Sequence, residues 1–342
     1  MEALLNRIWY QKHWARWLLW PLSWLFALLS GLRRLGFKLG LKASQALPVP
    51  VIIVGNITVG GSGKTPTVIY LIELLRHYGY HPGVISRGYG SGQTEPRLVP
   101  QGANPTDFGD EPAMIVARTQ VPMAVGVDRI ATAELLLASA EVDIIISDDG
   151  LQHYRLARDI EVVVLDASRR LGNGMLLPAG PLREGEWRLE SADFVIHNGA
   201  ASDTVREFGM QLIPGAVLSV AGENQTQAPT APMAVKAMAG IGNPERFFET
   251  LSQMGFKLEA QEVFADHQAY SLKALTPLGD ELPLLMTEKD AIKCREFAKQ
   301  HWWYLAVNAK LSPQFDAQLL TRVREAMASK QKANQKGQSD GV

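Results

Sequence analysis

The fold is decided by residues 51–66, Val51-Ile-Ile-Val-Gly-Asn-Ile-Thr-Val-Gly-Gly-Ser-Gly-Lys-Thr-Pro66. The first four residues are apolar and mostly β-branched, which predicts a buried strand. A glycine-rich turn follows, and after Lys64 and Thr65 the apolar run 68–75 has the spacing of a helix. A strand, a glycine loop, Lys-Thr and a helix, in that order, form the context of a phosphate-binding loop. We therefore predict that the chain binds a nucleoside triphosphate.

The residue types in this loop suit phosphate. Small residues let backbone N–H groups converge on phosphate oxygens, and the helix N-terminus adds the positive end of its dipole. Lys64 is expected to reach the β- and γ-phosphates, and the Thr65 hydroxyl to bind Mg²⁺. The usual pattern has glycine where this chain has Thr58, so an ordinary glycine turn is the alternative interpretation. The residues expected to contact the triphosphate are Thr58, Val59, Gly60, Gly61, Ser62, Gly63, Lys64 and Thr65.

Length and composition limit the class of protein. The chain has 342 residues, enough for two domains that each have a core. Its net charge of −1 gives no general argument for nucleic acid, and we expect no nucleic-acid partner. The single cysteine, Cys294, excludes an internal disulfide framework and fits a reducing cytosol.

The first 42 residues differ in composition from the rest of the chain. They hold five of the eight tryptophans and seven Lys or Arg residues against one acidic residue, Glu2. Residues 17–32 form a 16-residue run without charge that contains Pro21 as a break, and a spanning helix needs about 20 residues. Tryptophan and arginine together favour the headgroup region, so we predict a helix that lies in a membrane interface. A spanning anchor and a helix of a soluble core are the alternatives.

Beyond the loop, short apolar segments alternate with helical ones. This alternation is typical of an α/β fold in which helices cover both faces of a parallel sheet. Residues 43–221 are therefore predicted to form a P-loop NTPase domain with a mainly parallel sheet. The further strands are predicted at 83–86, 122–126, 144–147, 161–165 and 194–197, and the helices at 68–78, 111–118, 130–139 and 203–208.

A smaller α/β domain is predicted at residues 222–328. It begins with the polar, proline-containing segment 222–232, which lacks periodicity and is expected to be a linker. A ribbon strand at 216–220 is expected to join the domains. The final segment, 329–342, is rich in Lys, Gln and Ser, and we predict that it is disordered. Strands are predicted at 235–240, 262–265, 284–287 and 304–307, and helices at 245–254 and 290–300.

Acidic residues follow two of the predicted strands. Asp148 and Asp149 end the strand 144–147, and a carboxylate at such a place is the usual Mg²⁺-organising partner of a phosphate loop. The alternative is a carboxylate that caps the following turn. Asp166 also ends a strand, but it lacks the polar continuation Gly150-Leu-Gln-His153 and is not included in the site.

Polar residues on two further loops are candidates for contact with a ligand. Arg87 and Tyr89 lie in Ser86-Arg-Gly-Tyr-Gly90 at the carboxyl end of a predicted strand, where ligands bind in open α/β sheets. They either contact nucleotide or acceptor or belong to an ordinary turn. Arg183, on the proline-containing loop 177–184, suits charge stabilisation of a transferring phosphoryl group.

Three short acidic segments allow two interpretations each. Asp110 and Glu111 directly precede a helix, so they either cap it or supply a general base beside the γ-phosphate. His267 follows a predicted strand in the second domain and is either structural or turned towards the cleft between domains. The segment Thr287-Glu-Lys-Asp290 either contacts the nucleotide or caps the next helix.

Together these segments resemble the tetraacyldisaccharide 4′-kinases, the lipid A 4′-kinases of Gram-negative bacteria. In that family threonine replaces the first loop glycine, as Thr58 does here. The matching segments occur in order over about two-thirds of the chain: Thr58-Val-Gly-Gly-Ser-Gly-Lys-Thr-Pro66, Ser86-Arg-Gly-Tyr-Gly90, Gly109-Asp-Glu-Pro112, Asp148-Asp-Gly-Leu-Gln-His153, Leu177-Pro-Ala-Gly-Pro-Leu-Arg-Glu184, Asp266-His267 and Thr287-Glu-Lys-Asp290.

The resemblance implies that ATP and Mg²⁺ are used to phosphorylate the 4′-hydroxyl of a tetraacylated glucosamine disaccharide 1-phosphate, giving lipid IVA. It makes Asp110 the base and pairs it with His267. It implies that Lys64 and Arg183 hold the phosphates. It further implies that Thr65, Asp149 and Glu184 organise Mg²⁺, and that the remaining site positions are Arg87, Tyr89, Glu111, Arg129, Asp148 and Gln152.

The resemblance also implies a location and a motion. The N-terminal helix would dock on the cytoplasmic face of the bacterial inner membrane, where the lipid substrate lies. Closure of the two domains over ATP would bring His267 to Asp110 and exclude water. We expect the protein to act as a monomer.

Two functions of other classes remain as alternatives. One is a GTP-driven carrier or metallochaperone, although Thr287-Glu-Lys-Asp290 does not fit the guanine-reading pattern Asn-Lys-x-Asp and no cluster of Cys and His suggests a metal cargo. The other is a membrane-tethered ATP-binding scaffold without transfer chemistry. In a scaffold, replacement of Asp110 would leave turnover unchanged.

Overall fold

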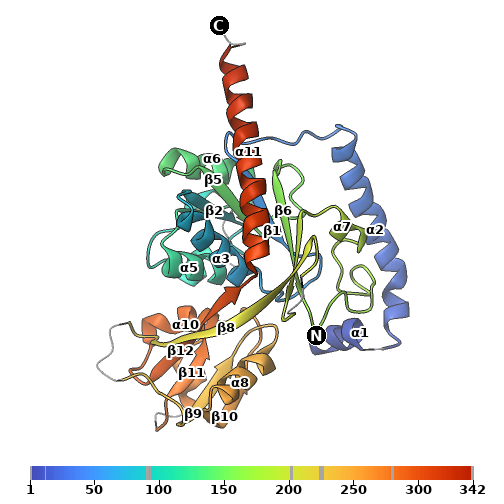
Figure 1. Ribbon diagram of the computed structural model, residues 1–342. Helices are drawn as coiled ribbons and strands as arrows, with labels where there is room; N and C mark the ends of the chain where they lie inside the picture. The colour runs from blue at the N-terminus through green and yellow to red at the C-terminus, as the bar shows by residue number, and fades with distance from the viewer. Residues whose placement is uncertain are drawn as a thin grey trace.

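One mostly parallel sheet runs through the molecule. The computed structural model describes residues 2–11, 13–89, 92, 94–200, 203–222, 227–278 and 281–339. In these residues twelve strands form one sheet in the order β10-β9-β11-β12-β8-β7-β6-β1-β5-β2-β4-β3 (Figure 1). Neighbouring strands are parallel except for the pairs β3–β4 and β8–β12. The predicted α/β class with a mainly parallel sheet is therefore confirmed.

Strands and helices alternate over much of the chain, as the sequence predicts, although β2 and β3, β5 and β6, and β7 to β9 follow one another without a helix between them. The strands are β1 (Val51–Gly55), β2 (Pro82–Ser86), β3 (Arg97–Leu98), β4 (Met123–Val125), β5 (Ile144–Asp148), β6 (Ile160–Asp166), β7 (Phe194–Asn198), β8 (Glu207–Ser219), β9 (Ala234–Ala239), β10 (Lys257–Val263), β11 (Leu284–Thr287) and β12 (Trp302–Lys310). The helices are α1 (Glu2–Tyr10), α2 (Arg16–Lys38), α3 (Lys64–His77), α4 (Pro105–Phe108), α5 (Asp110–Thr119), α6 (Arg129–Ser139), α7 (Trp187–Glu190), α8 (Pro244–Gln253), α9 (Leu272–Leu275), α10 (Glu288–Cys294) and α11 (Pro313–Ser339), with 3₁₀ turns at Thr276–Leu278 and Arg295–Phe297.

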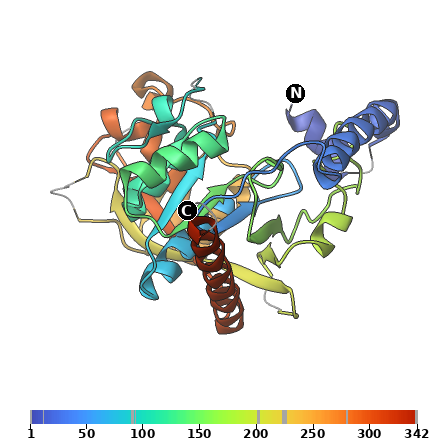
Figure 2. The same ribbon diagram turned by 90° about the horizontal axis from the view of Figure 1, so that it is seen from above.

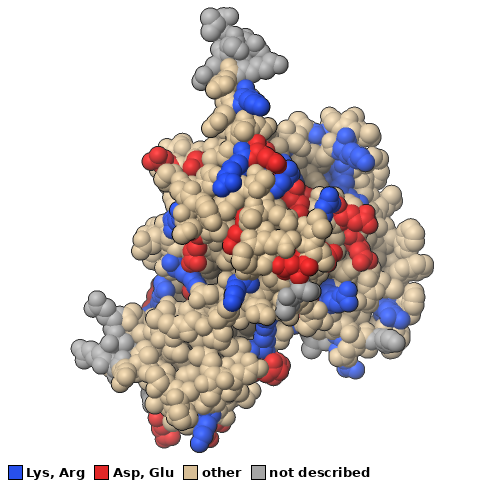
Figure 3. Space-filling model, in the orientation of Figure 1, with Lys and Arg blue, Asp and Glu red and all other residues tan. Residues whose placement is uncertain are grey.

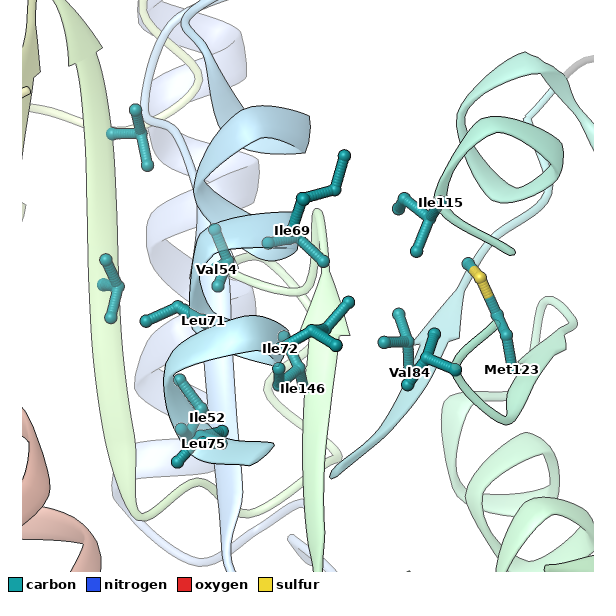
Figure 4. Packing of buried hydrophobic residues seen from close by; sticks show 14 of the residues in the cluster. Ile52, Val54, Ile69, Leu71, Ile72, Leu75, Val84, Ile115, Met123 and Ile146 are labelled. Carbon is teal, nitrogen blue, oxygen red and sulfur yellow. The ribbon is translucent and has the colours of Figure 1, made fainter. Parts of the chain in front are cut away.

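The central strand β1 is buried on both faces, which explains its unbroken apolar sequence. Ile52 and Val54 lie in one hydrophobic cluster with residues of α3 and α5, whereas Val51 and Ile53 lie in a second cluster with residues of α6. Figure 4 shows the first cluster, in which side chains from α3 pack against the sheet. Full burial of one such side chain contributes roughly 1.5–3 kcal/mol. Helices on both faces therefore hold the phosphate-binding loop on a rigid base.

Strand β8 joins the two halves of the sheet. Its first residues pair in parallel with β7, and the stretch from Gln211 to Ser219 pairs antiparallel with β12 (Figure 1). The predicted ribbon strand 216–220 is confirmed but is longer than expected. The predicted helix 203–208 is wrong, because Phe208 lies in β8, fully buried against Phe194 and Phe315. Pairing with β7 overrides the weak local helix signal.

Helix α11 corrects the predicted C-terminal boundaries. Its residues Phe315, Leu319 and Val323 belong to the hydrophobic cluster around β1, so this helix packs on the N-terminal half and not on the unit 222–328. The predicted disordered tail is wrong for residues 329–339, which continue α11, and residues 340–342 lie outside the described residues. Packing of the first turns starts the helix. The tail contains no proline that would end the helix, and Lys330 Nζ lies 3.3 Å from Asp159 Oδ2. Both features let the helix continue.

Three predictions in the C-terminal half require adjustment. The strand predicted at 262–265 is β10 at Lys257–Val263. It is an exposed edge strand with many polar residues, so its sequence lacks the apolar run by which buried strands are recognised. The helix predicted at 290–300 ends as α10 at Cys294 and is followed by a 3₁₀ turn. The predicted linker 222–232 is irregular at 227–232, and residues 223–226 lie outside the described residues. The other predicted strands of this half match β9, β11 and β12 to within a few residues.

The N-terminal helices lie along one side of the molecule, away from strands β9, β10 and β11 (Figures 1 and 2). Helix α2 continues through Pro21, so the predicted break at this proline is wrong. Ser23 is buried, and its Oγ donates to Leu176 O at 2.9 Å and accepts from Ala179 N at 3.0 Å. The outer edge of the molecule over α2 is largely uncharged (Figure 3). The large apolar side chains that α2 exposes are Trp17, Leu18, Trp20, Leu22, Trp24, Leu25, Leu28, Leu29, Leu32 and Leu35.

The length and hydropathy of the helices bear on membrane spanning. None of the helices in the described residues combines the length and the apolar character needed to cross a bilayer.

Candidate active site

The phosphate-binding loop is held by a second loop. Val59 N donates to Pro181 O at 2.9 Å, and Arg183 N donates to Ile57 O at 2.7 Å. These bonds attach loop 177–184 to the glycine loop in the manner of a short ribbon. Arg183 therefore lies beside the phosphate site although it is far from it in the sequence.

Gly63 ends the loop immediately before α3 in a conformation that favours glycine. Its φ of +97° lies in the left-handed region, and a Cβ at this position would lie 2.6 Å from Asn198 Nδ2. Asn198, at the end of β7, donates through Nδ2 to Ser62 O at 3.2 Å. Asn198 is not among the site residues predicted from the sequence. Its position at the carboxyl end of a parallel strand is the signal that points to it.

Two cations converge on Asp149. Lys64 Nζ lies 3.6 Å from Asp149 Oδ1, and Arg183 NH1 lies 3.1 Å from Asp149 Oδ2. Burial raises the pKa of Asp149, but the nearby charges of Lys64 and Arg183 outweigh burial and hold this pKa below its usual range. A carboxylate therefore lies where two cations meet, and phosphate oxygens would compete with it for the same partners.

Asp148 has a different environment. It is 1% exposed, Ser86 Oγ donates to its Oδ2 at 3.4 Å, and its Oδ1 is buried without a hydrogen-bond partner. Burial, followed by the charge of Glu111, raises the pKa of Asp148, and Lys64 opposes this rise. An unpartnered buried carboxylate oxygen beside a phosphate loop fits a bound cation, because a cation would supply the missing partner.

Other predicted site residues surround this pair of carboxylates. Arg129 is buried at the start of α6, and burial lowers its pKa to about 10 against the opposing charges of Asp148 and Asp149. Gln152 Nε2 donates to Asn56 O at 3.3 Å, at the beginning of the phosphate-binding loop. Arg87 is exposed, and its charge acts on Arg129. Gly90, the last residue of that predicted loop, lies outside the described residues.

Asp110 and His267 are brought together from opposite halves of the molecule. His267 Nδ1 lies 3.1 Å from Asp110 Oδ2, and the Tyr89 ring is 5.5 Å from the His267 ring between centroids. Asp110 is the first residue of α5, and the N-cap position before it is Gly109, which has no side chain to cap the helix. Burial raises the pKa of Asp110, whereas the hydrogen bond with His267 and the charges of Lys293 and Lys289 lower it, and the net pKa is below the usual range.

Lysines of α10 complete this cluster. Lys289 Nζ lies 2.9 Å from Asp266 Oδ1 and 3.6 Å from Glu111 Oε1, and Lys293 Nζ lies 3.5 Å from Asp110 Oδ2. Lys293 was not identified from the sequence, although it follows Lys289 by four residues and so shares a helix face with it. Of the two interpretations of Thr287-Glu-Lys-Asp290, helix capping is confirmed, because Thr287 Oγ1 accepts from Asp290 N at 3.2 Å.

Glu184 does not offer a free carboxylate. It is 5% exposed, the Tyr154 hydroxyl donates to its Oε1, and Arg188 Nε lies 3.3 Å from its Oε2. Its Oε2 makes no hydrogen bond, but the ion pair with Arg188 offsets its charge, which weighs against the predicted part of Glu184 in the Mg²⁺ site. Asp166, the last residue of β6, accepts from Ser168 N and Arg169 N and so caps its own turn, which agrees with its absence from the predicted site.

Comparisons with known proteins identify the family of this chain. The model of the LpxK family, described as tetraacyldisaccharide-1-P 4′-kinase, matches residues 15–324. A tetraacyldisaccharide 4′-kinase of Shewanella baltica (strain OS155 / ATCC BAA-1091) is 60% identical, with 97% of this chain and 98% of the relative covered. A relative of the same name from Shewanella sp. (strain ANA-3) is also 60% identical, with 100% of both chains covered.

A solved structure is similar over most of its length. It is a crystal structure of LpxK from Aquifex aeolicus, the "apo" form in complex with ATP. It superposes with a TM-score of 0.78 at 29% identity and covers 90% of this chain and 99% of its own. Because the family model spans most of this chain and the relatives are far above 30% identity over their full length, the chain belongs to the tetraacyldisaccharide-1-P 4′-kinase family.

Proposed function

We propose that this protein transfers the γ-phosphate of ATP to the 4′-hydroxyl of a tetraacyldisaccharide 1-phosphate, giving lipid IVA in lipid A biosynthesis. The observation that carries the proposal is the 3.1 Å pairing of Asp110 with His267, next to a phosphate-binding loop whose lysine is directed at a carboxylate. A kinase needs both parts, because a triphosphate must be held and an acceptor hydroxyl must lose its proton.

The chemistry follows from the two groups. Asp110 accepts the proton of the 4′-hydroxyl while the hydroxyl oxygen attacks the γ-phosphorus. The bond from the γ-phosphorus to the bridging oxygen breaks, and ADP leaves with that oxygen. His267 orients the Asp110 carboxylate through the contact at Oδ2. Lys64 and Arg183 move from Asp149 to the phosphate oxygens and stabilise the charge that is transferred.

Residues of the site also fit the metal ion that such a transfer requires. The Thr65 hydroxyl at the start of α3 and the carboxylates of Asp149 and Asp148 are the oxygen donors that we assign to Mg²⁺. Bound Mg²⁺ would neutralise charge on the β- and γ-phosphates. Since Mg²⁺ keeps several waters and shares phosphate oxygens, few protein carboxylates suffice. Glu184 is kept out of this set because of its existing partners.

The lipid acceptor implies a membrane surface. Helix α2 presents a wide exposed apolar face with basic residues near its end, which suits a bilayer interface with anionic lipids. We place the protein at the cytoplasmic face of the inner membrane, where ATP is available, and as a monomer. The segments 43–221 and 222–312 are proposed as the two lobes that close over ATP, with α11 added to the first lobe.

The two alternatives lose their support. A GTP-driven carrier and an ATP-binding scaffold without transfer do not match a family that is named for a kinase. An ATP-binding scaffold also gives no reason for a histidine–aspartate pair beside the phosphate loop.

The test is phosphate transfer by the purified protein with γ-labelled ATP, Mg²⁺ and the lipid acceptor in detergent micelles. Asp110→Ala should lower transfer about 10²–10⁴-fold, the usual contribution of a general base, with the Kd for ATP unchanged. Asp107→Ala, an exposed acid in the preceding helix α4, serves as the matched control and should transfer normally. Transfer by Asp110→Ala at the wild-type rate would remove Asp110 as the base, and absence of transfer in the wild type would contradict the function itself.

A further inference from the structure

Helix α10 from the second lobe places two lysines against the start of α5 from the first lobe, and the two helices are in contact (Figure 1). Lys293 lies 3.5 Å from Asp110 Oδ2 and Lys289 lies 3.6 Å from Glu111 Oε1. Their side chains are only 6% and 14% exposed, respectively. A lysine buried to this degree is unusual unless its charge is paired, so these lysines contribute to the site and not to an exposed surface.

Lys293 is held by a rigid support. Asp290 is fully buried and accepts from Gly240 N at 2.9 Å, Tyr270 Oη at 2.8 Å and Thr287 Oγ1 at 2.6 Å. Lys293 Nζ lies 3.6 Å from Asp290 Oδ1 and 5.0 Å from the centre of the Tyr270 ring. The ammonium group therefore lies between one carboxylate of its own lobe and Asp110 of the other lobe.

Both basic side chains that contact Asp110 approach the same oxygen. His267 Nδ1 and Lys293 Nζ each approach Oδ2, at 3.1 and 3.5 Å. We propose that Lys293 is a positioning residue for the base: its ammonium group holds Asp110 ionised and fixes Oδ2, so that Oδ1 accepts the proton of the acceptor hydroxyl. This inference rests on the proposed kinase function and assigns a part in it to a residue that touches neither ATP nor the acceptor.

The surrounding charges agree with this arrangement. Asp110 is faced by His267 from the loop after β10, by Lys293 and Lys289 from α10, and by Glu111, its own neighbour. Lys289 is bound to Asp266 and Glu111, which leaves Lys293 as the lysine whose ammonium contacts Asp110 directly. Once Asp110 has accepted the proton, its attraction to Lys293 is lost, which favours release of the proton before the next turnover.

The experiment compares the pH dependence of kcat/KM in the wild type, Lys293→Met and Lys293→Arg. A base acts only when ionised, so activity falls below its pKa. Removal of a cation within about 4 Å raises the pKa of a carboxylate by about one unit or more. In Lys293→Met the acid limb should therefore move by about one unit to higher pH. Because Asp110 Oδ2 is no longer held in place, kcat at pH 7 should also fall at least about 10-fold, with KM for ATP unchanged. Lys293→Arg, which keeps the charge, should restore most of both.

Three controls separate this proposal from a structural effect. Lys273→Met removes an exposed charge from the same lobe and should leave the profile unchanged. In an Asp110→Asn background, Lys293→Met should have no further effect on kcat, because the two residues act as a unit. If Lys293→Met does not fold, as judged by thermal unfolding, Lys293→Gln carries the same test because it keeps a hydrogen-bond donor for Asp290.

The inference and the proposed function fail separately. Transfer by the wild type together with an unmoved acid limb in Lys293→Met or Lys293→Gln would overturn the role of Lys293 alone. So would an additive effect of the Lys293 and Asp110 changes. Absence of transfer by the wild type would instead refute the kinase function.

Discussion

Gly63 and Asn198 illustrate how single side chains shape the phosphate site. Asn198 donates to Ser62 O and thereby fixes the loop, and it lies where any side chain at position 63 would have to go. Lys64, the next residue, begins α3 and points at Asp149. A change at Gly63 therefore disturbs both the backbone that binds phosphate and the lysine that follows it.

Gly63→Ala is expected to destabilise the protein and weaken ATP binding. The left-handed conformation at this position alone costs about 1–3 kcal/mol for a residue with a Cβ, and the contact with Asn198 adds to it. Thermal unfolding and calorimetric titration with ATP measure the two effects. Gly31→Ala is the matched control, because its Cβ would meet open space in the middle of α2, and helix propensity predicts a gain of up to about 1 kcal/mol. Equal behaviour of the two variants would contradict this view of the loop.

Three carboxylates that look alike in the sequence have separate environments in the structure. Asp149 lies between two cations, Asp148 is buried with one oxygen unpartnered, and Glu184 is bound by Arg188 and Tyr154. An acidic residue beside a phosphate loop is a candidate metal ligand by its type. Which of the three is free to bind a metal ion depends on partners that come from distant segments.

Helix α11 follows the strands of the C-terminal half in the sequence but packs on the N-terminal half of the molecule. Its first turns place Phe315 among Phe194, Phe208 and Tyr70 on the N-terminal half. The Tyr70 hydroxyl also donates to Asp316 Oδ1 at 2.6 Å, and burial followed by this bond raises the pKa of Tyr70. Helix α11 thus covers the face of the sheet that is formed by β7 and the first residues of β8.

Phe315→Ala should therefore destabilise the whole fold and not only the chain end. Truncation of a fully buried phenylalanine costs about 3–5 kcal/mol, from the lost transfer free energy and the cavity left behind. Denaturant unfolding monitored by tryptophan fluorescence measures this loss. Lys332→Ala on the exposed part of the same helix should change the free energy of unfolding by no more than about 0.5 kcal/mol. A loss below about 1 kcal/mol for Phe315→Ala would show that α11 is not part of the core.

The molecule as a whole has two features that match a lipid kinase. The proposed site lies where the two proposed lobes meet, with Asp110 from one and His267 and Lys293 from the other. On one side of the first lobe, α2 carries its exposed apolar face, and Arg34 lies 4.0 Å over the Trp187 ring. This contact attaches the end of α2 to the segment that follows loop 177–184. The helix is thereby connected to the part of the chain that carries Arg183.

Helix α2 is expected to bind bilayers through its apolar face. Leu25→Glu combined with Leu29→Glu should abolish co-flotation with vesicles that contain anionic phospholipid, because a charge at each site opposes burial in the acyl region. The Kd for ATP should remain unchanged. Leu272→Glu, an exposed leucine of the second lobe, is the control and should float as the wild type does. Unchanged flotation of the double variant would rule out α2 as the membrane-binding element.

The sequence alone determined the phosphate-binding loop, the alternation of strands and helices and the apolar N-terminal helix. These features depend on local patterns. One is the hydrophobic period of each segment, and the other is the presence of glycine where the backbone of a tight loop needs a conformation that other residues rarely adopt. Lys64, Thr65 and the strand-ending Asp148 and Asp149 were found for the same reason. Asp110 and His267 were candidates from the sequence, and the family resemblance added their pairing, since no local pattern can bridge a separation of 157 positions.

Tertiary structure alone decided the rest. Pairing with two partners made β8 a strand where local propensity predicted a helix, and packing placed α11 on the first lobe. Contacts between segments far apart in the chain joined Tyr154 to Glu184 and brought Lys293 to Asp110. The physical reason is the same in each case: the free energy of these contacts depends on burial and on neighbours far away in the chain. The segment Val51–Pro66 therefore predicts phosphate binding from the sequence alone. The proposed transfer of that phosphate depends on residues that only the tertiary structure brings together.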